Sequence, residues 1–290
     1  MYDRENHGNT VPLVVNHEIT NFPSATTLEL LQKVRARRPR APKTVAVLAD
    51  PVFFKDDERV RHGAGSKGLN GPGPRYGTQS NPITSSPRGL SSARGSGIHL
   101  TRLYFSREEA RRILAVTPHG EGMAALGFEA NLATVMSNKV KEFRILHFAT
   151  HAIVDNRRPE LSGLVLSLVD SAGRPQSGFL GIEDIYNMSL PVDLVVLSAC
   201  DTALGKDIPG EGLTGLTHAF LYAGASRVLA SLWEVEDRAT AELMGWFYAG
   251  MEQKSMTPAA ALRSAQIKMW QQPRRRAPSY WASFEIQGEY

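Results

Sequence analysis

The sequence predicts an α/β fold, a three-layer α/β/α sandwich with a mainly parallel central sheet. The strand candidates are continuous apolar runs, such as TVAVLA at 44–49 and LVVLS at 194–198, and they do not alternate between apolar and polar residues. Such strands are buried on both faces, which is typical of a parallel sheet covered by helices. Stretches with helical periodicity lie between them, as the crossover connections of parallel strands require.

The elements alternate along the chain, and turn residues separate them. We expect strands at 44–49, 144–149, 163–168, 194–198 and 227–232. We expect helices at 25–34, 107–116, 129–141, 182–187, 211–222, 237–250 and 258–271. The helix at 107–116 carries a clear start signal, because Ser106 is a suitable N-cap and Glu109 follows three residues later. Residues 170–173 are expected to form a turn.

The chain divides into two parts. Residues 1–40 form an N-terminal segment with a basic connector, and residues 41–290 form the main domain. The basic run 35–43 contains two prolines, and we interpret it as a solvated connector. Residues 56–97 are rich in Gly, Ser, Pro and Arg and have almost no large apolar side chain. They cannot bury enough surface to offset the entropy of ordering, so we expect a mobile insertion there.

Composition excludes several classes of protein. Hydrophobic residues make up 42% of the chain and charged residues 21%, which excludes a disordered or fibrous protein. The net charge of +4 does not by itself indicate nucleic acid binding, which would need the basic runs 35–43 and 274–276 on one face. We expect no membrane segment and no secretory signal, because no apolar run is long enough. The single cysteine, Cys200, favours a reducing, cytoplasmic location.

Two reactive side chains follow strands at their carboxyl ends, where functional residues of parallel sheets gather. His151 comes after the strand 144–149, and Cys200 comes after the strand 194–198. If these strands are parallel neighbours, both side chains lie at the same edge of the sheet. A thiolate can then attack a substrate, while the imidazole takes the thiol proton and returns it to the leaving group.

Two other interpretations of these residues are open. A lone cysteine next to an apolar strand is commonly a small buried hydrophobe. A zinc site of His147, His151 and Cys200 is conceivable, although a fourth ligand and a CxxC motif are missing. His147 lies in the middle of its strand, so we interpret it as a hydrogen-bonded core histidine.

The motifs around these residues resemble the CHAT domain family, in family order. They are APKTVAVLADPVF at 41–53, ILHFATHA at 145–152, VVLSACDTALG at 195–205, the block 210–240, TPAAALRSAQ at 257–266 and SYWASFEIQGE at 279–289. CHAT domains are similar to caspases and separases, so the resemblance implies a caspase-like sandwich and a peptidase domain at 41–290. It implies His151 as general base and Cys200 as nucleophile, with no cofactor and no metal. The backbone N–H groups of Cys200 and Ala152 are expected to bind the oxyanion.

The resemblance also implies substrate-binding acids. LWEVED at 232–237 resembles a separase segment whose last aspartate selects arginine before the scissile bond, and the matching residue is Asp237. Asp237 fits equally well as the N-cap of the helix 237–250. Asp155, close to His151 in the sequence, is a second candidate acid.

We therefore expect a cytoplasmic cysteine endopeptidase that cleaves a protein substrate after a basic residue. The alternative is a catalytically silent CHAT-like module for interaction or scaffolding. Ala152, where the family often has glycine, and the short N-terminal portion favour this alternative. CHAT domains commonly follow helical repeats, often of the tetratricopeptide type. We accordingly expect a regulatory helical-repeat region or partner, and a chain that is a fragment or a shortened member of the family.

Overall fold

The computed structural model describes residues 11–22, 24, 26, 29, 32–33, 38–60, 100–155, 158–198, 201–204 and 211–289, with side chains omitted at 201–204 and 211–213. Cys200 lies outside the described residues, as do most of the expected insertion 56–97 and of the expected helix 25–34. No helix in the described part of the chain is long and apolar enough to cross a membrane.

A seven-stranded central sheet runs through the domain in the order β1-β11-β10-β8-β4-β2-β3. Its strands are β1 (Thr20–Asn21), β2 (Lys43–Ala49), β3 (Gly122–Leu126), β4 (Phe143–Ala149), β8 (Leu194–Leu197), β10 (Arg227–Ser231) and β11 (Phe284–Gly288). The five strands from β10 to β3 are mutually parallel, and β11 is antiparallel to β10. The expected mainly parallel sheet is thus confirmed, and β4 and β8 are direct parallel neighbours.

Besides the central sheet that the sequence predicts, the described residues form a second sheet of four strands, in the order β7-β6-β5-β9. Its strands are β5 (His151–Asp155), β6 (Gly163–Val165), β7 (Phe179–Gly181) and β9 (Asp201–Leu204). The chain passes from β4 into β5 across Thr150 alone, and the Thr150 hydroxyl donates to the carbonyl of Val165 on β6. β4 and β8 are therefore each followed closely by a strand of the second sheet, and β5 and β9 are again parallel neighbours.

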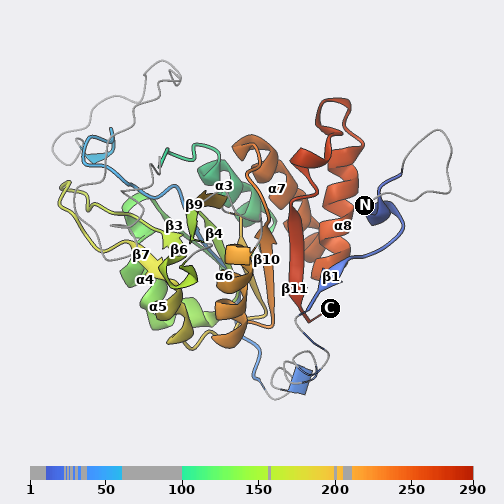
Figure 1. Ribbon diagram of the computed structural model, residues 1–290, viewed down its shortest axis with the longest axis horizontal. Coiled ribbons are helices and arrows are strands. Elements are labelled where there is room, and N and C mark those ends of the chain that lie inside the picture. The colour runs from blue at the N-terminus through green and yellow to red at the C-terminus, as the bar shows by residue number, and fades with distance from the viewer. Residues whose placement is uncertain are drawn as a thin grey trace.

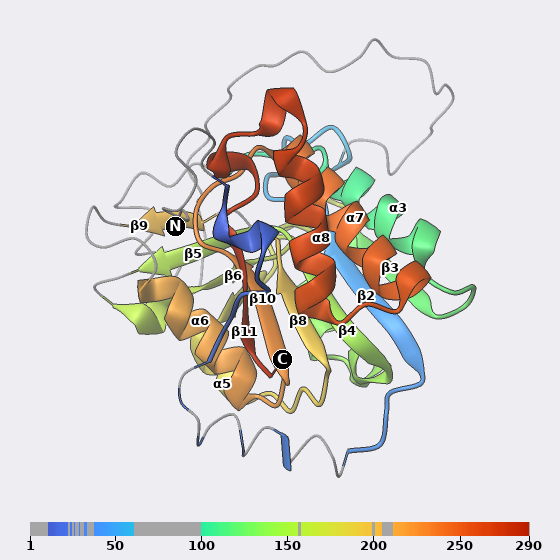
Figure 2. The same ribbon diagram turned by 90° about the vertical axis from the view of Figure 1, so that its right-hand side faces the viewer.

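Helices cover both faces of the central sheet (Figure 1). They are α3 (Ser106–Val116), α4 (Leu132–Met136), α5 (Ile182–Tyr186), α6 (Glu211–Tyr222), α7 (Asp237–Lys254) and α8 (Pro258–Trp270). The helices α3, α7 and α8 lie on one face, and α4, α5 and α6 lie on the other, as the turned view in Figure 2 also shows for all but α4. The three-layer sandwich predicted from the apolar strands is confirmed.

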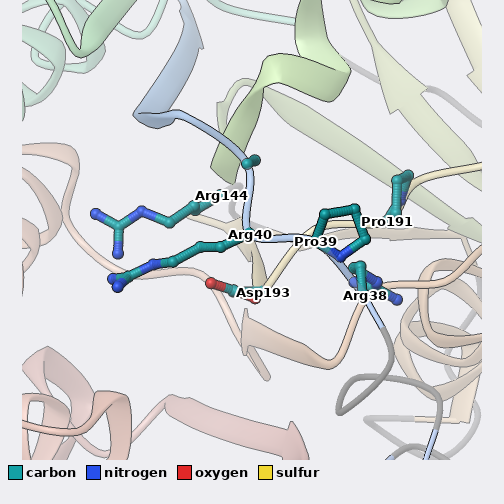
Figure 3. A pocket seen from close by; sticks show the side chains of 7 residues that line it. Arg38, Pro39, Arg40, Arg144, Pro191 and Asp193 are labelled. Atoms are coloured by element: carbon teal, nitrogen blue, oxygen red, sulfur yellow. The ribbon is translucent and has the colours of Figure 1, made fainter.

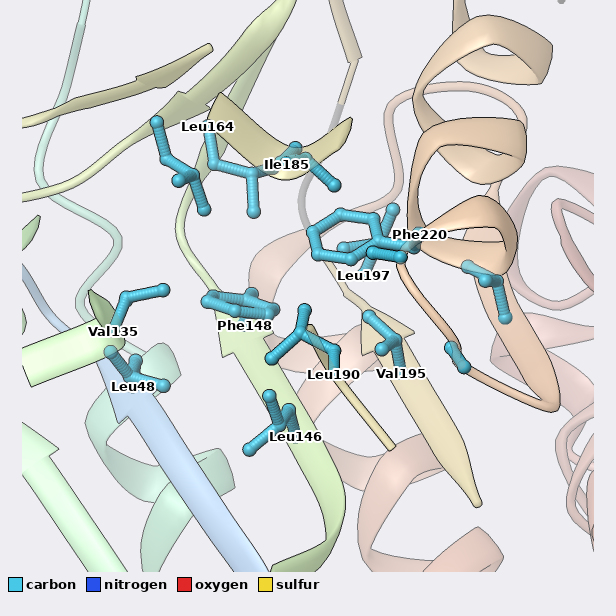
Figure 4. Close-up of a cluster of buried hydrophobic side chains, with 14 of the residues drawn as sticks. Leu48, Val135, Leu146, Phe148, Leu164, Ile185, Leu190, Val195, Leu197 and Phe220 are labelled. Carbon is cyan, nitrogen blue, oxygen red and sulfur yellow. The ribbon is translucent and has the colours of Figure 1, made fainter. Parts of the chain in front are cut away.

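Alternation of side chains along each strand fills two separate cores. On β2, Leu48 faces the α4–α6 side, and its neighbour Val47 faces the α3–α7–α8 side. On β4, Phe148 points to the α4–α6 side, where Figure 4 shows it beside Leu48 and close to Phe220 of α6. Burial on both faces explains why these strands read as continuous apolar runs.

Two helix predictions differ from the structure. The expected helix 129–141 is instead two short pieces: α4 begins only at Leu132, where the Asn131 side chain accepts the backbone N–H of Thr134, and it ends at Met136, because Ser137 is extended. A 3-10 turn at Asn138–Glu142 follows. Ser106 is not the N-cap of α3. That position belongs to Phe105, and the Ser106 hydroxyl instead donates to the carbonyl of Leu103.

The N-terminal residues that the structure describes pack onto the main domain. A 3-10 turn at Leu13–Val15 lies against α8, where the Arg263 guanidinium donates to the carbonyl oxygens of Val14 and Val15. The short strand β1 extends the central sheet by pairing in parallel with β11. Residues far apart in the sequence thus form one edge of the sheet, where β1 lies beside β11 (Figure 1).

Candidate active site

His151 begins β5, directly past the carboxyl end of β4, and its side chain is buried with 4% exposure. The ring nitrogen Nε2 lies 2.7 Å from the carbonyl oxygen of Thr101. A carbonyl oxygen only accepts hydrogen bonds, so Nε2 carries a proton and donates it. The ring of Phe53 packs beside the imidazole at 5.4 Å between centroids.

The other ring nitrogen of His151, Nδ1, is buried and has no hydrogen-bond partner among the described residues. Burial lowers the pKa of His151, and this effect outweighs the Thr101 hydrogen bond and the charge of Glu234, which raise it. The imidazole is therefore neutral near pH 7, with its basic lone pair on Nδ1. A buried polar atom without a partner is rare in native proteins and indicates a function or a missing partner.

The strand pairs on both sides of Cys200 keep one register. Phe148 of β4 pairs with Leu197 of β8, and Ala152 of β5 pairs with Asp201 of β9. The residue numbers differ by 49 in both pairs (197 − 148 and 201 − 152). The backbone N–H of Ser198 continues the β4–β8 ladder, with a bond of 3.1 Å to the carbonyl of Phe148.

Ala152 follows His151 within β5 and is buried. Among the described residues other than glycine, only Asp50 and Ser255 have a positive φ. The backbone at Ala152 therefore does not need glycine, and alanine at this position carries no conformational penalty.

Asp237 is the first residue of α7, and the N-cap position belongs to Glu236, whose side chain makes no capping bond. The Asp237 carboxylate accepts the backbone N–H of Phe105 at 2.8 Å, so the interpretation as the N-cap of its own helix is wrong. Burial raises the pKa of Asp237 to about 6, against the effect of the Phe105 bond, and the nearby charges of Glu109, Asp50 and Glu236 raise it further.

A small cavity lies between the N-termini of α3 and α7 and the carboxyl ends of β4 and β8. Its lining consists of Leu103, Ser106, Glu109, Ala149, Ser198, Asp237 and Thr240. The hydroxyl of Thr240 is buried there and has no hydrogen-bond partner among the described residues. Two carboxylates and three hydroxyl groups therefore line this cavity beside Ser198, which lies two positions before Cys200 in the sequence.

A buried polar network crosses the sandwich next to this cavity. The Nε2 atom of His147 lies 2.7 Å from the Glu109 carboxylate and 3.2 Å from the Ser198 hydroxyl, and Nδ1 lies 3.0 Å from the Tyr248 hydroxyl. With the carboxylate as acceptor, Nε2 carries the proton and Nδ1 accepts from Tyr248. The expectation that His147 is a hydrogen-bonded core histidine is confirmed, and both its ring nitrogens are already engaged.

A second network at this edge was not predicted from the sequence. The buried carboxylate of Asp50, past the end of β2, binds Arg59 at 2.9 Å, Arg102 at 2.8 Å and Arg107 at 2.8 Å. Arg59 and Arg102 flank residues 61–99, so one carboxylate holds the described chain on both sides of that segment. The first residues of the expected insertion, up to residue 60, are thus anchored to the domain.

Asp155, the other candidate acid, ends β5 four residues beyond His151. Four residues of strand separate their Cα atoms by about 13 Å. The Asp155 carboxylate accepts the backbone N–H of Arg158 at 2.9 Å and lies 3.6 Å from the Arg158 guanidinium. These contacts give the side chain a place in the turn that follows β5.

The described parts of the two basic runs lie at opposite edges of the central sheet. Arg38 donates to the carbonyl oxygens of Val192 and Gly224, which precede β8 and β10. Arg275 pairs with Glu242 in α7, which follows β10. The common face that nucleic acid binding would need is therefore missing. Among the described residues, no group of three or more His, Cys, Asp or Glu side chains is placed to hold a metal ion.

The mainly parallel sheet with helices on both faces is that of a caspase-like, peptidase-related fold. The family model for the CHAT domain matches residues 1–289, and the chain belongs to the CHAT domain family. Tetratricopeptide repeat protein 28 of Homo sapiens is 34% identical over 113 residues, which cover 39% of this chain and 4% of that protein. Its Mus musculus counterpart is 35% identical over 105 residues, 36% of this chain and 4% of that protein. The matches thus span a small part of these relatives.

Proposed function

We propose that the chain is a cysteine endopeptidase of the cytoplasm, with His151 as general base and Cys200 as nucleophile. The observation that carries this proposal is the state of His151. Its Nε2–H is held by the carbonyl of Thr101, and its basic Nδ1 atom is buried without a described partner. A base that is neutral, oriented and unpaired is what the activation of a thiol requires.

The register of the flanking strands supports the pairing with Cys200. The equal offset of 49 on both sides supports this pairing, since 200 − 151 is also 49. Neighbouring parallel strands lie about 4.8 Å apart, which is within reach of a side-chain hydrogen bond. On this basis we assign the Cys200 sulfur as the missing partner of Nδ1.

The proposed reaction follows from these positions. His151 Nδ1 takes the thiol proton, and the Cys200 thiolate attacks the scissile carbonyl carbon. The resulting oxyanion is assigned to the backbone N–H groups of Cys200 and Ala152. The peptide C–N bond then breaks, and Nδ1 returns the proton to the leaving amine. Water, deprotonated by the same nitrogen, hydrolyses the thioester and restores the thiol.

We further propose that Asp237 selects a basic side chain before the scissile bond. The support is its place in the cavity beside Ser198, together with Glu109. The cavity is small, so a guanidinium group would enter only as the side chains around it move apart. Asp155 is the weaker candidate for this role, because its carboxylate already contacts Arg158. The curated relatives are named as tetratricopeptide repeat proteins, which supports a helical-repeat region or partner as regulator.

Covalent labelling tests the dyad. Cys200 is the only cysteine of the sequence, so every thiol adduct found by mass spectrometry lies on that residue. A peptide acyloxymethyl ketone with arginine before the warhead is expected to label the wild-type protein, and the same probe with aspartate serves as control. Cys200→Ala and His151→Ala are each expected to abolish peptide cleavage, because the two residues act as one unit.

If iodoacetamide alkylates Cys200 but neither peptide probe labels it, and no peptide in a degenerate library is cleaved, the chain is the catalytically silent module. Labelling that His151→Ala leaves unchanged would instead remove His151 from the role of base.

A further inference from the structure

A pocket of about 320 Å³ lies at the amino edge of the central sheet, where β2, β4 and β8 begin. Its lining consists of Arg38, Pro39, Arg40, Ala41, Arg144, Pro191 and Asp193 (Figure 3). This is the edge opposite to His151. Nothing in the proposed peptidase reaction uses these residues, so the pocket needs an explanation of its own.

Two guanidinium groups of this pocket have unused hydrogen-bond donors. The side chains of Arg40 and Arg144 extend side by side in the same direction in Figure 3. Arg144 donates one hydrogen bond, of 2.9 Å, to the hydroxyl of Thr44, and no hydrogen bond joins Arg40 to a described residue. Neither forms an ion pair within 4.0 Å among the described residues, whereas three other arginines share the carboxylate of Asp50. Adjacent like charges repel, and a bound anion would offset that repulsion.

The acids around the pocket leave these donors available. Glu252 of α7 is close enough to Arg144 and Arg40 for their charges to act on it, yet burial and the charge of Glu121 raise its pKa. The carboxylate of Glu121 accepts the Thr44 hydroxyl at 2.5 Å. Asp193 contributes a single carboxylate to the wall. None of the three makes an ion pair with either arginine in the described structure.

The walls of the pocket are held in place before any ligand arrives. Arg38 donates to the backbone carbonyl oxygens of Val192 at 3.1 Å and Gly224 at 2.6 Å, which fixes the incoming chain against the sheet edge. Pro39 and Pro191 restrict the backbone on either side. A preformed site loses little conformational entropy on binding.

We propose that this pocket binds a small phosphate ester that carries hydroxyl groups, of the sugar-phosphate or nucleotide class. The planar forks of Arg40 and Arg144 match the oxygens of a phosphate group, and arginine binds such groups bidentately. The carboxylate of Asp193 accepts a hydroxyl of the ester. The volume lies at the lower end of the range for small-molecule sites, so a single sugar ring with its phosphate fits better than a longer ligand.

Isothermal titration of the full chain with ribose 5-phosphate tests this site. Saturable binding is expected, and Arg40→Gln and Arg144→Gln are each expected to weaken it about tenfold, the loss of one charge-assisted contact. Arg40 is exposed, so its variant tests the site even if Arg144→Gln is poorly folded. Arg111→Gln is the matched control, because Arg111 is exposed on α3 and pairs, among the described residues, only with Glu108.

Asp193→Asn separates the ester from a bare anion. This substitution is expected to weaken the binding of ribose 5-phosphate but to leave the binding of inorganic phosphate unchanged. The proposal is overturned if ribose 5-phosphate does not saturate, or if Arg40→Gln binds as tightly as wild type. Equal affinity for ribose 5-phosphate and inorganic phosphate, unaffected by Asp193→Asn, would refute the sugar-binding part.

Discussion

Replacing Asp237 by asparagine is expected to stabilise the protein while it impairs cleavage after arginine. Burial raises the pKa of this carboxyl from 3.8 to about 6 in the folded chain. Each pKa unit corresponds to about 1.4 kcal/mol, so keeping Asp237 ionised in the folded state costs about 2 to 3 kcal/mol above pH 6. Asparagine has the same shape and an oxygen that still accepts the N–H of Phe105.

The direction of the pKa shift of Asp237 determines how the stability of the protein depends on pH. A raised acid pKa means that the folded state holds the proton more tightly than the unfolded state does, so stability falls as the pH rises from 3.8 to about 6. Asp237→Asn is therefore expected to match wild type below pH 4 and to exceed it by about 2 to 3 kcal/mol above pH 6. That gain corresponds to a rise in Tm on the order of 5 °C.

Thermal unfolding at pH 4 and pH 8, with cleavage of an arginine substrate measured in parallel, checks this prediction. Cleavage is expected to fall about tenfold or more, since a charge-assisted contact is lost, while alkylation of Cys200 by iodoacetamide persists. Glu183→Gln is the control, because it removes one negative charge from an exposed side chain in the first turn of α5, away from this cavity. An unchanged Tm at pH 8 would refute the burial argument, and unchanged cleavage would refute the pocket role without touching the dyad.

Two further predictions concern the buried networks. Tyr248→Phe leaves Nδ1 of His147 without its donor and is expected to cost about 1 to 3 kcal/mol in urea unfolding. Equal stability would mean that the histidine holds another tautomer or another partner. Asp50→Asn removes the charge that three arginines share and is expected to cost about 3 kcal/mol or more. A loss below about 1 kcal/mol would mean that solvent screens the cluster well.

The elements that sequence reasoning located are those in which both faces of a strand are buried. β2, β4, β8 and β10 are continuous apolar runs, and each lies within about a residue of its expected bounds. β11 was not predicted from the sequence, because it pairs antiparallel and alternates between buried and half-buried residues. β5 and β9 were not predicted either. They follow β4 and β8 so closely that the residues after each predicted strand were interpreted as loops.

The candidate site was located in part by the same logic. A position past a strand end was enough to single out His151, whereas the parallel pairing of β4 with β8 was only a condition until the structure showed it. The hydrogen-bond acceptor at Thr101 could not be predicted, because it is a backbone carbonyl 50 residues away from His151 and no side-chain pattern indicates it. The contacts of the Asp50 cluster and of the His147 network were not predicted for a related reason. Each joins side chains that only the tertiary fold brings together.

The two edges of the central sheet differ in their available charge, and this separates the two proposals. At the carboxyl edge, the carboxylates of Asp237 and Glu109 line one cavity, and the arginines nearby are already paired with Asp50. At the amino edge, the guanidinium groups of Arg40 and Arg144 have N–H donors that bind no described residue. The two proposals accordingly assign a cationic side chain to the first site and an oxyanion to the second, and the length of the strands separates the two sites. Because no described residue lines both cavities, a variant that disables one site leaves the chemistry of the other intact.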